Sequence, residues 1–271
     1  MNNLHRELAP ISTSAWAQIE LEASRTLKRY LSARRVVDVS DPLGISLSAV
    51  GTGHVHAIQA PGDGAQAAIR SVQPILELRV PFELTRQAID DVERGAEDSD
   101  WSPLKEAARK IAFAEDHAIF DGYAPAGIGG IREGISNSAI ALPPDVAGYP
   151  GAVEKAVNQL RLAGVNGPYT LVLGAQEYSS LYGEAEAGHS ILHHVERLVD
   201  GGIVWAPAIA GGLVLTARGG DFQLTIGQDI SIGYESHSRD TVELYFIETF
   251  TFRLLTSEAA VSLTVSANDS E

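Results

Sequence analysis

The feature that most constrains this chain is a pair of long extended segments with a turn between them. Residues 46–58 and 72–84 are strand-like, and the segment that separates them, residues 60–65 (APGDGA), is rich in turn-forming residues. A two-stranded arm of this kind is not stable alone in water. It must pack on its own domain or on a neighbouring subunit, and this requirement favours an oligomer.

The remaining chain mixes helices and strands. A helix is predicted over residues 14–33, because apolar residues recur there at steps of three and four. That apolar face consists of Trp16, Ile19, Ala23, Leu27, Tyr30 and Leu31. An extended segment should follow at residues 36–39, a short helix at 85–93, and a long helix that opens near Ser102 and Pro103 and ends at Gly122.

Residues 143–151 are rich in proline and glycine and are predicted to cross between domains. Beyond them we expect helices at 151–163, 176–182 and 190–199, and strands at 169–173, 203–206, 212–217, 222–226, 230–235, 241–256 and 259–265. This irregular order of element types predicts an α+β fold and not a regular winding of strands and helices.

Composition narrows the class of protein. The 271 residues include no cysteine, which excludes disulfides and thiolate metal sites and suits a reducing cytoplasm. No basic stretch followed by an apolar run opens the chain, so a secretory signal is not expected. The longest weakly polar stretch, residues 203–217, is too short and too interrupted to cross a membrane. We therefore predict a cytoplasmic protein with no membrane partner.

The charge pattern argues against a nucleic-acid partner. The chain has 20 basic and 35 acidic residues, a formal net charge of −15, whereas nucleic acids are held mainly by lysine and arginine. One local basic face is possible on the first helix and just beyond it. It would consist of Arg25, Lys28, Arg29, Arg34 and Arg35, although a solvated helix face is the simpler reading of these residues.

Motifs for catalysis are missing from the sequence. His54 and His56 share one side of a predicted strand, but no nearby carboxylate completes a metal-ligand set. There is no Gly-x-Ser-x-Gly elbow or triad signature, and the glycine-rich segment 127–130 follows a helix instead of a strand. We therefore predict no catalytic residues, no metal site and no cofactor, and a protein that is not an enzyme.

Four separate segments give the chain a family resemblance. Residues 4–10 (LHRELAP), 218–222 (RGGDF), 227–235 (GQDISIGYE) and 248–252 (ETFTF) stand in an order and spacing that resemble the type 1 encapsulins of the linocin, or bacteriocin-like, family. The resemblance covers essentially the whole chain. It implies the fold of tailed-phage major capsid proteins and a subunit of an icosahedral shell, a nanocompartment with sixty copies if all subunits occupy one environment.

The resemblance also implies a division of the chain. Encapsulin subunits combine a peripheral domain, an axial domain and an extended loop. On this chain the extended loop corresponds to residues 46–82 and the axial domain to residues 138–217. The peripheral domain then takes residues 1–45, 83–137 and 218–271.

A groove for cargo is the second implication. The family loads enzymes through short C-terminal peptides that bind the inner wall, between the N-terminal helix and a strand segment near the chain's end. The matching positions are Leu27, Tyr30, Leu31, Arg34 and Asp38, facing Asp229, Ile230, Ser231 and Tyr234. Apolar positions there would receive aliphatic side chains, and Arg34 and Asp38 would supply charged hydrogen bonds. Simple core packing is the alternative for each apolar residue.

A pore is the third implication. The glycine-bracketed loop 183–189 would surround the five-fold axis, with pore residues Gly183, Glu184, Glu186, Gly188 and His189. Repeated carboxylates would attract cations there. A loop whose charges face bulk solvent is the simpler alternative.

The sequence does not name the cargo. Family precedents are dye-decolourising peroxidases and ferritin-like iron oxidases, which imply roles in oxidative stress or in iron storage. Two other functions stay open from sequence, a viral major capsid protein with the same fold and a bacteriocin-like secreted protein with proteolytic activity.

Overall fold

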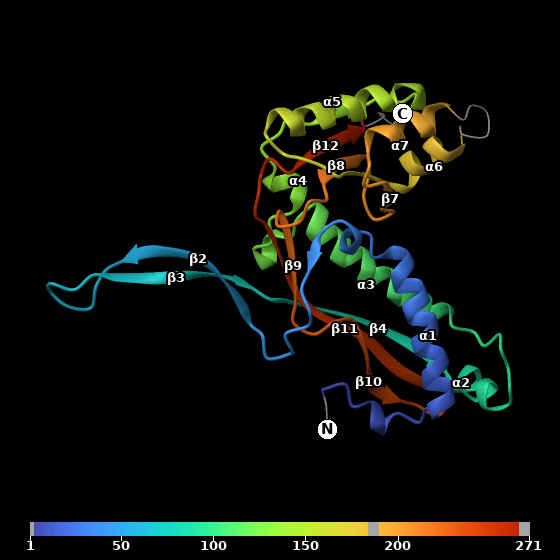
Figure 1. Ribbon diagram of the computed structural model, residues 1–271. Helices are drawn as coiled ribbons and strands as arrows, with labels where there is room; N and C mark the ends of the chain where they lie inside the picture. Colours follow the sequence, from blue (N-terminus) through green and yellow to red (C-terminus); the bar gives the residue numbers. More distant parts are fainter. Residues whose placement is uncertain (1–2, 184–189, 266–271) are drawn as a thin grey trace, which may run out of the picture.

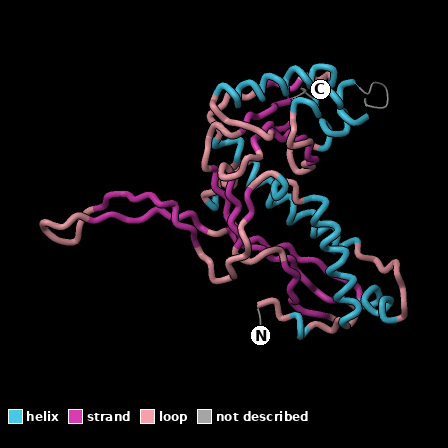
Figure 2. The backbone as a smooth tube through the Cα atoms, in the orientation of Figure 1, coloured by secondary structure: helices cyan, strands magenta, loops and turns pink. Residues whose placement is uncertain are grey.

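The computed structural model describes residues 3–183 and 190–265. They form two bodies, one above the other in Figure 1, and a thin arm that projects sideways. Both bodies contain helices and strands, which confirms the predicted α+β class. Figure 2 shows that the arm consists of strands and loops alone over the residues drawn there, whereas each body is bordered by helices.

The lower body is built on a five-stranded sheet. Its strand order is β1–β9–β11–β10, and β4 also pairs with β11. The strands are β1 (Asp38–Val39), β4 (Leu76–Thr85), β9 (Phe222–Ile226), β10 (Ser231–His237) and β11 (Thr241–Leu254). Strand β11 is long enough to pair with β4, β9 and β10 at once, so it connects the parts of this sheet.

Three helices pack on one face of this sheet. They are α1 (Thr13–Tyr30), α2 (Arg86–Glu93) and α3 (Ser102–Phe120). The side chain of Ser12 caps α1 by accepting a hydrogen bond from the Ala15 amide at 3.1 Å, and Thr85 caps α2 in the same way. Helix α3 begins one residue earlier than predicted, with Trp101 at the cap position, and it stops before Gly122, whose φ of 95° suits glycine.

The upper body is built on a second five-stranded sheet, in the order β5–β12–β8–β6–β7. Its strands are β5 (Ile140–Leu142), β6 (Tyr169–Leu173), β7 (Ile203–Trp205), β8 (Gly212–Thr216) and β12 (Ala260–Val265). Its helices are α5 (Tyr149–Leu162), α6 (Ala175–Gly183) and α7 (Ser190–Leu198). Short helical pieces complete the chain: η1 (Arg6–Leu8), η2 (Ala33–Arg35), η3 (Ala124–Ala126), α4 (Ile131–Gly134) and η4 (Val146–Gly148).

Three buried clusters hold these elements together. One lies between the helices and the sheet of the lower body, and a second lies between the helices and the sheet of the upper body. The third joins the two bodies, because Phe250 and Phe252 of β11 belong to the same cluster as Leu213 and Leu215 of β8. Burial of such apolar surface is the main favourable term in folding, so the two bodies are one packed unit.

Strand β12 lies in the upper sheet, where it pairs with β8 and β5. The family resemblance groups this strand with residues 218–254 in one domain, whereas those residues lie mainly in the lower body. Residues 260–263 of β12 are fully buried except Ser262, which is 8% exposed. Both faces of β12 need a buried environment, and the upper body provides it. The sequence pattern alone does not show which of the two sheets this strand joins.

The arm is a hairpin of β2 (Ala49–Ile58) and β3 (Ala67–Pro74). Its second strand begins earlier than expected, and the predicted strand 72–84 is divided between β3 and β4 at residue 75. Only the β3 part pairs with β2, while β4 enters the lower sheet beside β11. The division between β3 and β4 falls beside Pro74, which has no backbone N–H and so cannot donate a hydrogen bond to a neighbouring strand.

Candidate functional site

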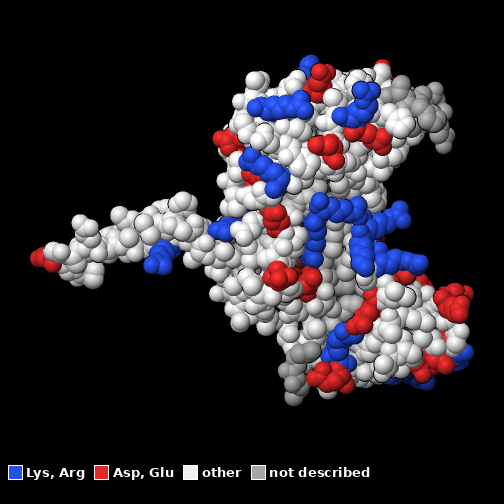
Figure 3. Space-filling model, viewed as in Figure 1, with Lys and Arg blue, Asp and Glu red and all other residues white. Residues whose placement is uncertain are grey.

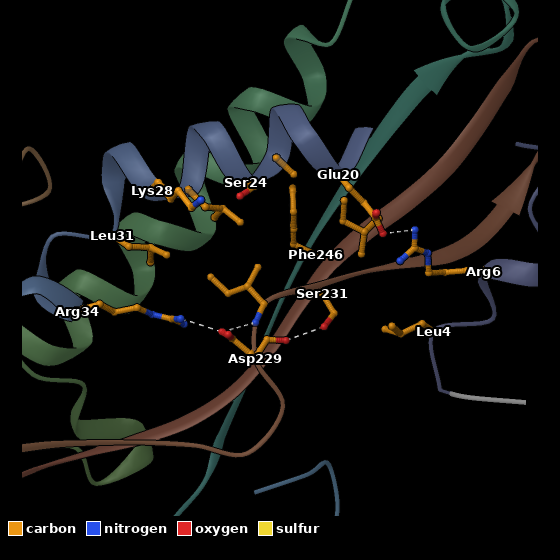
Figure 4. A pocket seen from close by; sticks show the side chains of 14 residues that line it. Leu4, Arg6, Glu20, Ser24, Lys28, Leu31, Arg34, Asp229, Ser231 and Phe246 are labelled. Atoms are coloured by element: carbon orange, nitrogen blue, oxygen red, sulfur yellow. Dashed lines mark hydrogen bonds and ion pairs between the residues drawn. The ribbon is translucent and has the colours of Figure 1, made fainter. Parts of the chain in front are cut away.

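A groove lies between α1 and the segment that leads into β10. It encloses about 430 Å³ (Figure 4). The residues that line it are Leu4, Arg6, Glu20, Ala23, Ser24, Leu27, Lys28, Leu31, Arg34, Asp229, Ile230, Ser231, Ile232 and Phe246. A volume of this size is in the range of small ligand sites, and the open shape also suits a short peptide.

The floor of the groove is apolar. Leu27 and Leu31 stand four residues apart, so they lie on one side of α1 and its continuation. Ile230 faces them from the segment before β10, and the fully buried Phe246 of β11 lies beneath. Aliphatic side chains of a bound peptide would find hydrophobic contacts here.

The rim of the groove is charged and polar. Arg6 forms an ion pair with Glu20 at 2.6 Å, and its guanidinium also stacks over the Trp16 ring at 4.1 Å. The N-terminal segment is fixed to the free edge of β10, because the Tyr234 amide donates to the Leu4 carbonyl at 2.8 Å. One end of the groove is therefore built by residues more than 200 positions away from β10.

Arg34 forms the opposite end of the groove as part of a buried charge cluster. Its guanidinium donates to both oxygens of Glu115, to Asp229 at 2.8 Å and to Glu248 at 2.5 Å. Glu115 and Glu248 are fully buried. These contacts fasten the Asp229 segment to the end of α1, so Arg34 holds the shape of the groove.

The protonation of this cluster follows from its burial. Burial, and then the neighbouring Glu115 carboxylate, raise the pKa of Glu248 well above its ordinary value. Burial alone would lower the pKa of Arg34, but its contacts with Glu115, Glu248 and Asp229 raise it overall, and the side chain stays charged. One arginine thus compensates two buried carboxyl groups, Glu115 and Glu248.

A third buried carboxyl group lies beside this cluster. Asp116 accepts hydrogen bonds from the amide of Ser32 at 3.1 Å, from the Ser32 hydroxyl and from the amide of Ala33 at 2.9 Å. These bonds fix the turn that follows α1. Burial nevertheless raises the pKa of Asp116 to about 7.

The structure brings six of the nine predicted groove residues together and places three elsewhere. Leu27, Leu31, Arg34, Asp229, Ile230 and Ser231 line the groove. Tyr30 lies on the other flank of α1, where its ring contacts Phe113 at 5.6 Å and Trp205 at 5.8 Å. One residue is a rotation of about 100° on a helix, so Tyr30 and Leu31 face different sides.

The other two predicted groove residues have partners within the fold. Asp38 accepts a hydrogen bond from the Gly220 amide at 2.7 Å and so holds the glycine turn before β9. The hydroxyl of Tyr234 shares a hydrogen bond with His237 Nδ1 at 2.5 Å. Neither residue lines the groove.

Sequence reasoning missed several lining residues. Glu20, Ser24 and Lys28 recur every four residues along α1, and this helical series could have been read beside Leu27 and Leu31. No local signal places Leu4 or Phe246 at the groove, because both arrive from remote parts of the chain.

The predicted pore lies mostly outside the described residues. Gly183 is the last residue of α6, and α7 begins at Ser190. Glu184, Glu186, Gly188 and His189 fall in the segment 184–189, which the structure does not describe. Helices α6 and α7 therefore flank the segment on which this prediction falls.

Metal-binding clusters and membrane-spanning helices are both absent from the described residues, 3–183 and 190–265. No group of three or more His, Asp or Glu side chains among them is arranged to hold a metal ion. None of their helices is long and apolar enough to cross a membrane. His54 and His56 are exposed on the arm.

Comparison with known proteins gives four likenesses: one family model, one relative and two solved structures. A family model described as an encapsulating protein for peroxidase matches residues 1–251. The type 1 encapsulin shell protein of Mycolicibacterium paratuberculosis is 56% identical over 264 residues, which cover 97% of this chain and 100% of that protein.

Solved structures show the same fold at low sequence identity. A virus-like particle from Pyrococcus furiosus has a TM-score of 0.65 and 16% identity, with 92% of this chain and 99% of that chain covered. The capsid of Myoviridae phage XM1 has a TM-score of 0.54 and 11% identity, with 86% of this chain and 91% of that chain covered. The predicted phage-capsid fold is therefore confirmed.

Proposed function

The chain belongs to the family of encapsulating proteins for peroxidase and is a shell subunit of an encapsulin nanocompartment, and we propose that the groove beside α1 holds its cargo enzyme. The cargo would bind through a C-terminal peptide on the inner wall of a closed icosahedral shell in the cytoplasm. The observation that carries this proposal is the apolar groove between α1 and β10, closed at one end by Arg34 and at the other by the N-terminal segment.

The nature of the cargo follows from the family and from the groove. The family is described by its encapsulation of a peroxidase, and we propose a peroxidase as cargo, which would serve in oxidative stress. A ferritin-like protein, with a role in iron storage, is the second candidate. The groove favours a peptide with alternating aliphatic and small side chains, because its floor is apolar and its rim is polar.

The size of the shell is testable directly. If every subunit occupies one environment, sixty copies of a 28.8 kDa chain form a particle of about 1.7 MDa. Light scattering on the purified chain should give this mass. A stable monomer would contradict closed assembly, whereas a larger uniform particle would correct only the number of copies.

Cargo loading tests the groove itself. Leu31→Asp or Ile230→Asp would put a charge on the apolar floor, and an unpaired charge in a desolvated site costs several kcal/mol. Shells should still assemble while the co-expressed cargo is lost, as measured by gel densitometry of purified particles. Leu21→Asp is a matched control, since Leu21 lies on the same helix, is 72% exposed and does not line the groove.

Loading in the Leu31→Asp and Ile230→Asp shells equal to that in the parent would show that the groove is misplaced. If the variants fail to assemble, a competition experiment on the parent shell replaces the loading measurement. Free cargo peptide should displace bound cargo, and a peptide that does not displace it would contradict the proposal.

We further propose that residues 183–189 line the opening through which small solutes enter. A ring of Glu184 and Glu186 around a symmetry axis would attract cations. The variant Glu184→Gln with Glu186→Gln should slow entry of a small cation to an encapsulated enzyme at low salt, while a neutral substrate enters as before. Unchanged entry of the cation would remove this loop from the proposal.

A further inference from the structure

The second flank of α1 forms another groove, and it has a different chemistry. This groove encloses about 460 Å³ between α1 and the first turns of α3. Cationic side chains reach into it from both helices, Arg25 and Arg29 from α1, and Lys105 and Arg109 from α3. We refer to it as the basic groove.

The basic groove is unusual for a chain with a net charge of −15. Eight of the 20 lysine and arginine residues lie in two short segments, residues 25–35 and 105–110. Figure 3 shows basic side chains gathered in the middle of the face viewed, over the C-terminal end of α1. A positive patch that persists in an acidic protein raises the local concentration of anions.

Part of this positive charge is not neutralised within the subunit. Arg109 is paired with Glu106 at 2.7 Å, and Arg25 approaches Glu22 at 3.4 Å. Among the ion pairs of residues 3–183 and 190–265, by contrast, none involves Arg29 or Lys105. Two cations from opposite walls are therefore available to a ligand.

The carboxylates of Glu22 and Glu106 also line the groove, each paired with an arginine, and the other lining groups suit an anionic ligand. The hydroxyl groups of Thr26 and Ser102 line the basic groove and can donate hydrogen bonds to an anion. Tyr30 also lines it, with its ring held in place by Phe113 and Trp205. The guanidinium of Arg29 lies over the Trp205 ring at 5.5 Å, which restricts the positions that this arginine can adopt.

We propose that the basic groove binds a small anion with two or more phosphate groups. Arginine matches phosphate oxygens with two parallel hydrogen bonds, and lysine adds a point charge. Cations on opposite walls suit a short chain of phosphates better than one isolated anion. The volume of the groove is that of a small-molecule site, and the overall acidity of the chain disfavours a long nucleic acid.

This site is separate from the cargo groove but shares a helix with it. Helix α1 presents Leu27 to one groove and Arg29 to the other. A phosphate ligand and a cargo peptide would therefore contact opposite flanks of one helix. The proposal does not depend on cargo binding, because cargo-free shells contain the complete basic groove.

Equilibrium dialysis of tripolyphosphate against cargo-free shells at low salt tests the proposal. The parent should bind saturably, and Arg29→Gln combined with Lys105→Gln should raise the dissociation constant about tenfold, since each removes charged hydrogen bonds. Lys110→Gln is the matched control, because Lys110 lies on α3, has the same charge and does not line the groove. It should change the dissociation constant by less than about twofold.

A gain of binding gives an independent check. Glu106→Gln would release Arg109 from its carboxylate partner and should tighten tripolyphosphate binding. This variant removes two exposed ion pairs, those of Glu106 with Arg109 and with Lys110, so the fold should be unaffected. Comparison of the affinities for ATP and tripolyphosphate identifies the source of the phosphates. If ATP binds more tightly than tripolyphosphate and Tyr30→Leu removes this difference, the ligand is a nucleotide. If the two bind equally, the ligand is inorganic polyphosphate.

Three results would overturn the proposal. They are absence of saturable binding by the parent shell, equal weakening by Lys110→Gln and by the groove variants, and displacement of tripolyphosphate by an acidic peptide at lower concentration than by ATP. The last result would identify the basic groove as a docking surface for acidic protein segments. Particle mass by light scattering should be recorded for each variant, so that weakened binding is compared between intact shells.

Discussion

The arm and the lower body use β-branched and aromatic residues in opposite ways. In the lower body, Phe250 and Phe252 of β11 are at most 1% exposed and face the upper sheet. In the arm, Val55 and Ile69 are 62% and 57% exposed, and β2 and β3 pair only with each other. The body therefore has its own core, whereas the arm has apolar surface and strand edges that only another molecule can cover.

This difference separates folding from assembly. A hairpin without a third strand or a helix is marginally stable at best, and uncovered edges invite uncontrolled pairing. Contact with neighbouring subunits would satisfy both needs. We therefore expect the arm to depend on such contacts, whereas the bodies contain buried cores of their own.

The largest expected effect comes from charge on the arm. Ile69→Asp and Val72→Asp should abolish the large particle, because each places a charge on an apolar surface that neighbours cover. Light scattering should show small species, while circular dichroism of the bodies and their melting temperature stay near those of the parent. Ile69→Val, which keeps the surface apolar, should assemble. Normal particles from either Asp variant would mean that the arm is not an assembly contact.

The sequence predicted the arm more completely than the groove. Turn residues between two extended segments predict a hairpin from local sequence alone. Because such a hairpin needs a further element to pack against, it was also the evidence for an oligomer. The exchange of partners at residue 75 was not predictable, since β3 and β4 look like one continuous strand until β11 is in place.

The groove shows the limit of local pattern. Helical spacing placed Leu27 and Leu31 on one face of α1. The partners of Arg34 are 81, 195 and 214 residues away, and the partner of Leu4 is in β10, so no spacing rule reveals them. The positions of these residues depend on how the lower sheet brings the two ends of the chain together.

A smaller effect is expected inside the body, at Arg34. Arg34→Met would leave Glu115 and Glu248 buried without a cation, a change that costs about 3–5 kcal/mol when one partner of a buried pair is removed. Urea unfolding of the subunit should show this loss. Arg35→Met is the matched control, since Arg35 is exposed and donates only to main-chain carbonyls of α1, and it should cost less than about 1 kcal/mol.

Adding Glu115→Gln and Glu248→Gln to Arg34→Met should recover part of the lost stability, because neutral amides need no buried cation. An unfolding free energy in Arg34→Met equal to that of the parent would show that the charge cluster does not stabilise the body. The stability that distinguishes the body from the arm would then come from apolar packing alone.

The last expected effect is a change in how the stability of the body depends on pH. Burial raises the pKa of Asp116 to about 7, whereas in the unfolded chain it has its ordinary value near 3.8. Between these values the folded state holds a proton that the unfolded state releases, so stability from this group is present at low pH and decreases as pH rises. The slope should approach 1.4 kcal/mol, roughly, for each pH unit.

The variant Asp116→Asn isolates this contribution, because asparagine keeps the shape of the side chain but does not titrate. Its unfolding free energy may not be compared with the parent at a single pH, since the amide also changes the hydrogen bonds to Ser32 and Ala33. The informative quantity is the difference in slope between pH 4 and pH 7, measured by urea unfolding. An identical slope in both proteins would mean that Asp116 is ionised throughout this range, held so by its three hydrogen-bond donors. A steeper loss in the parent would show that this buried carboxyl group makes the stability of the body depend on pH.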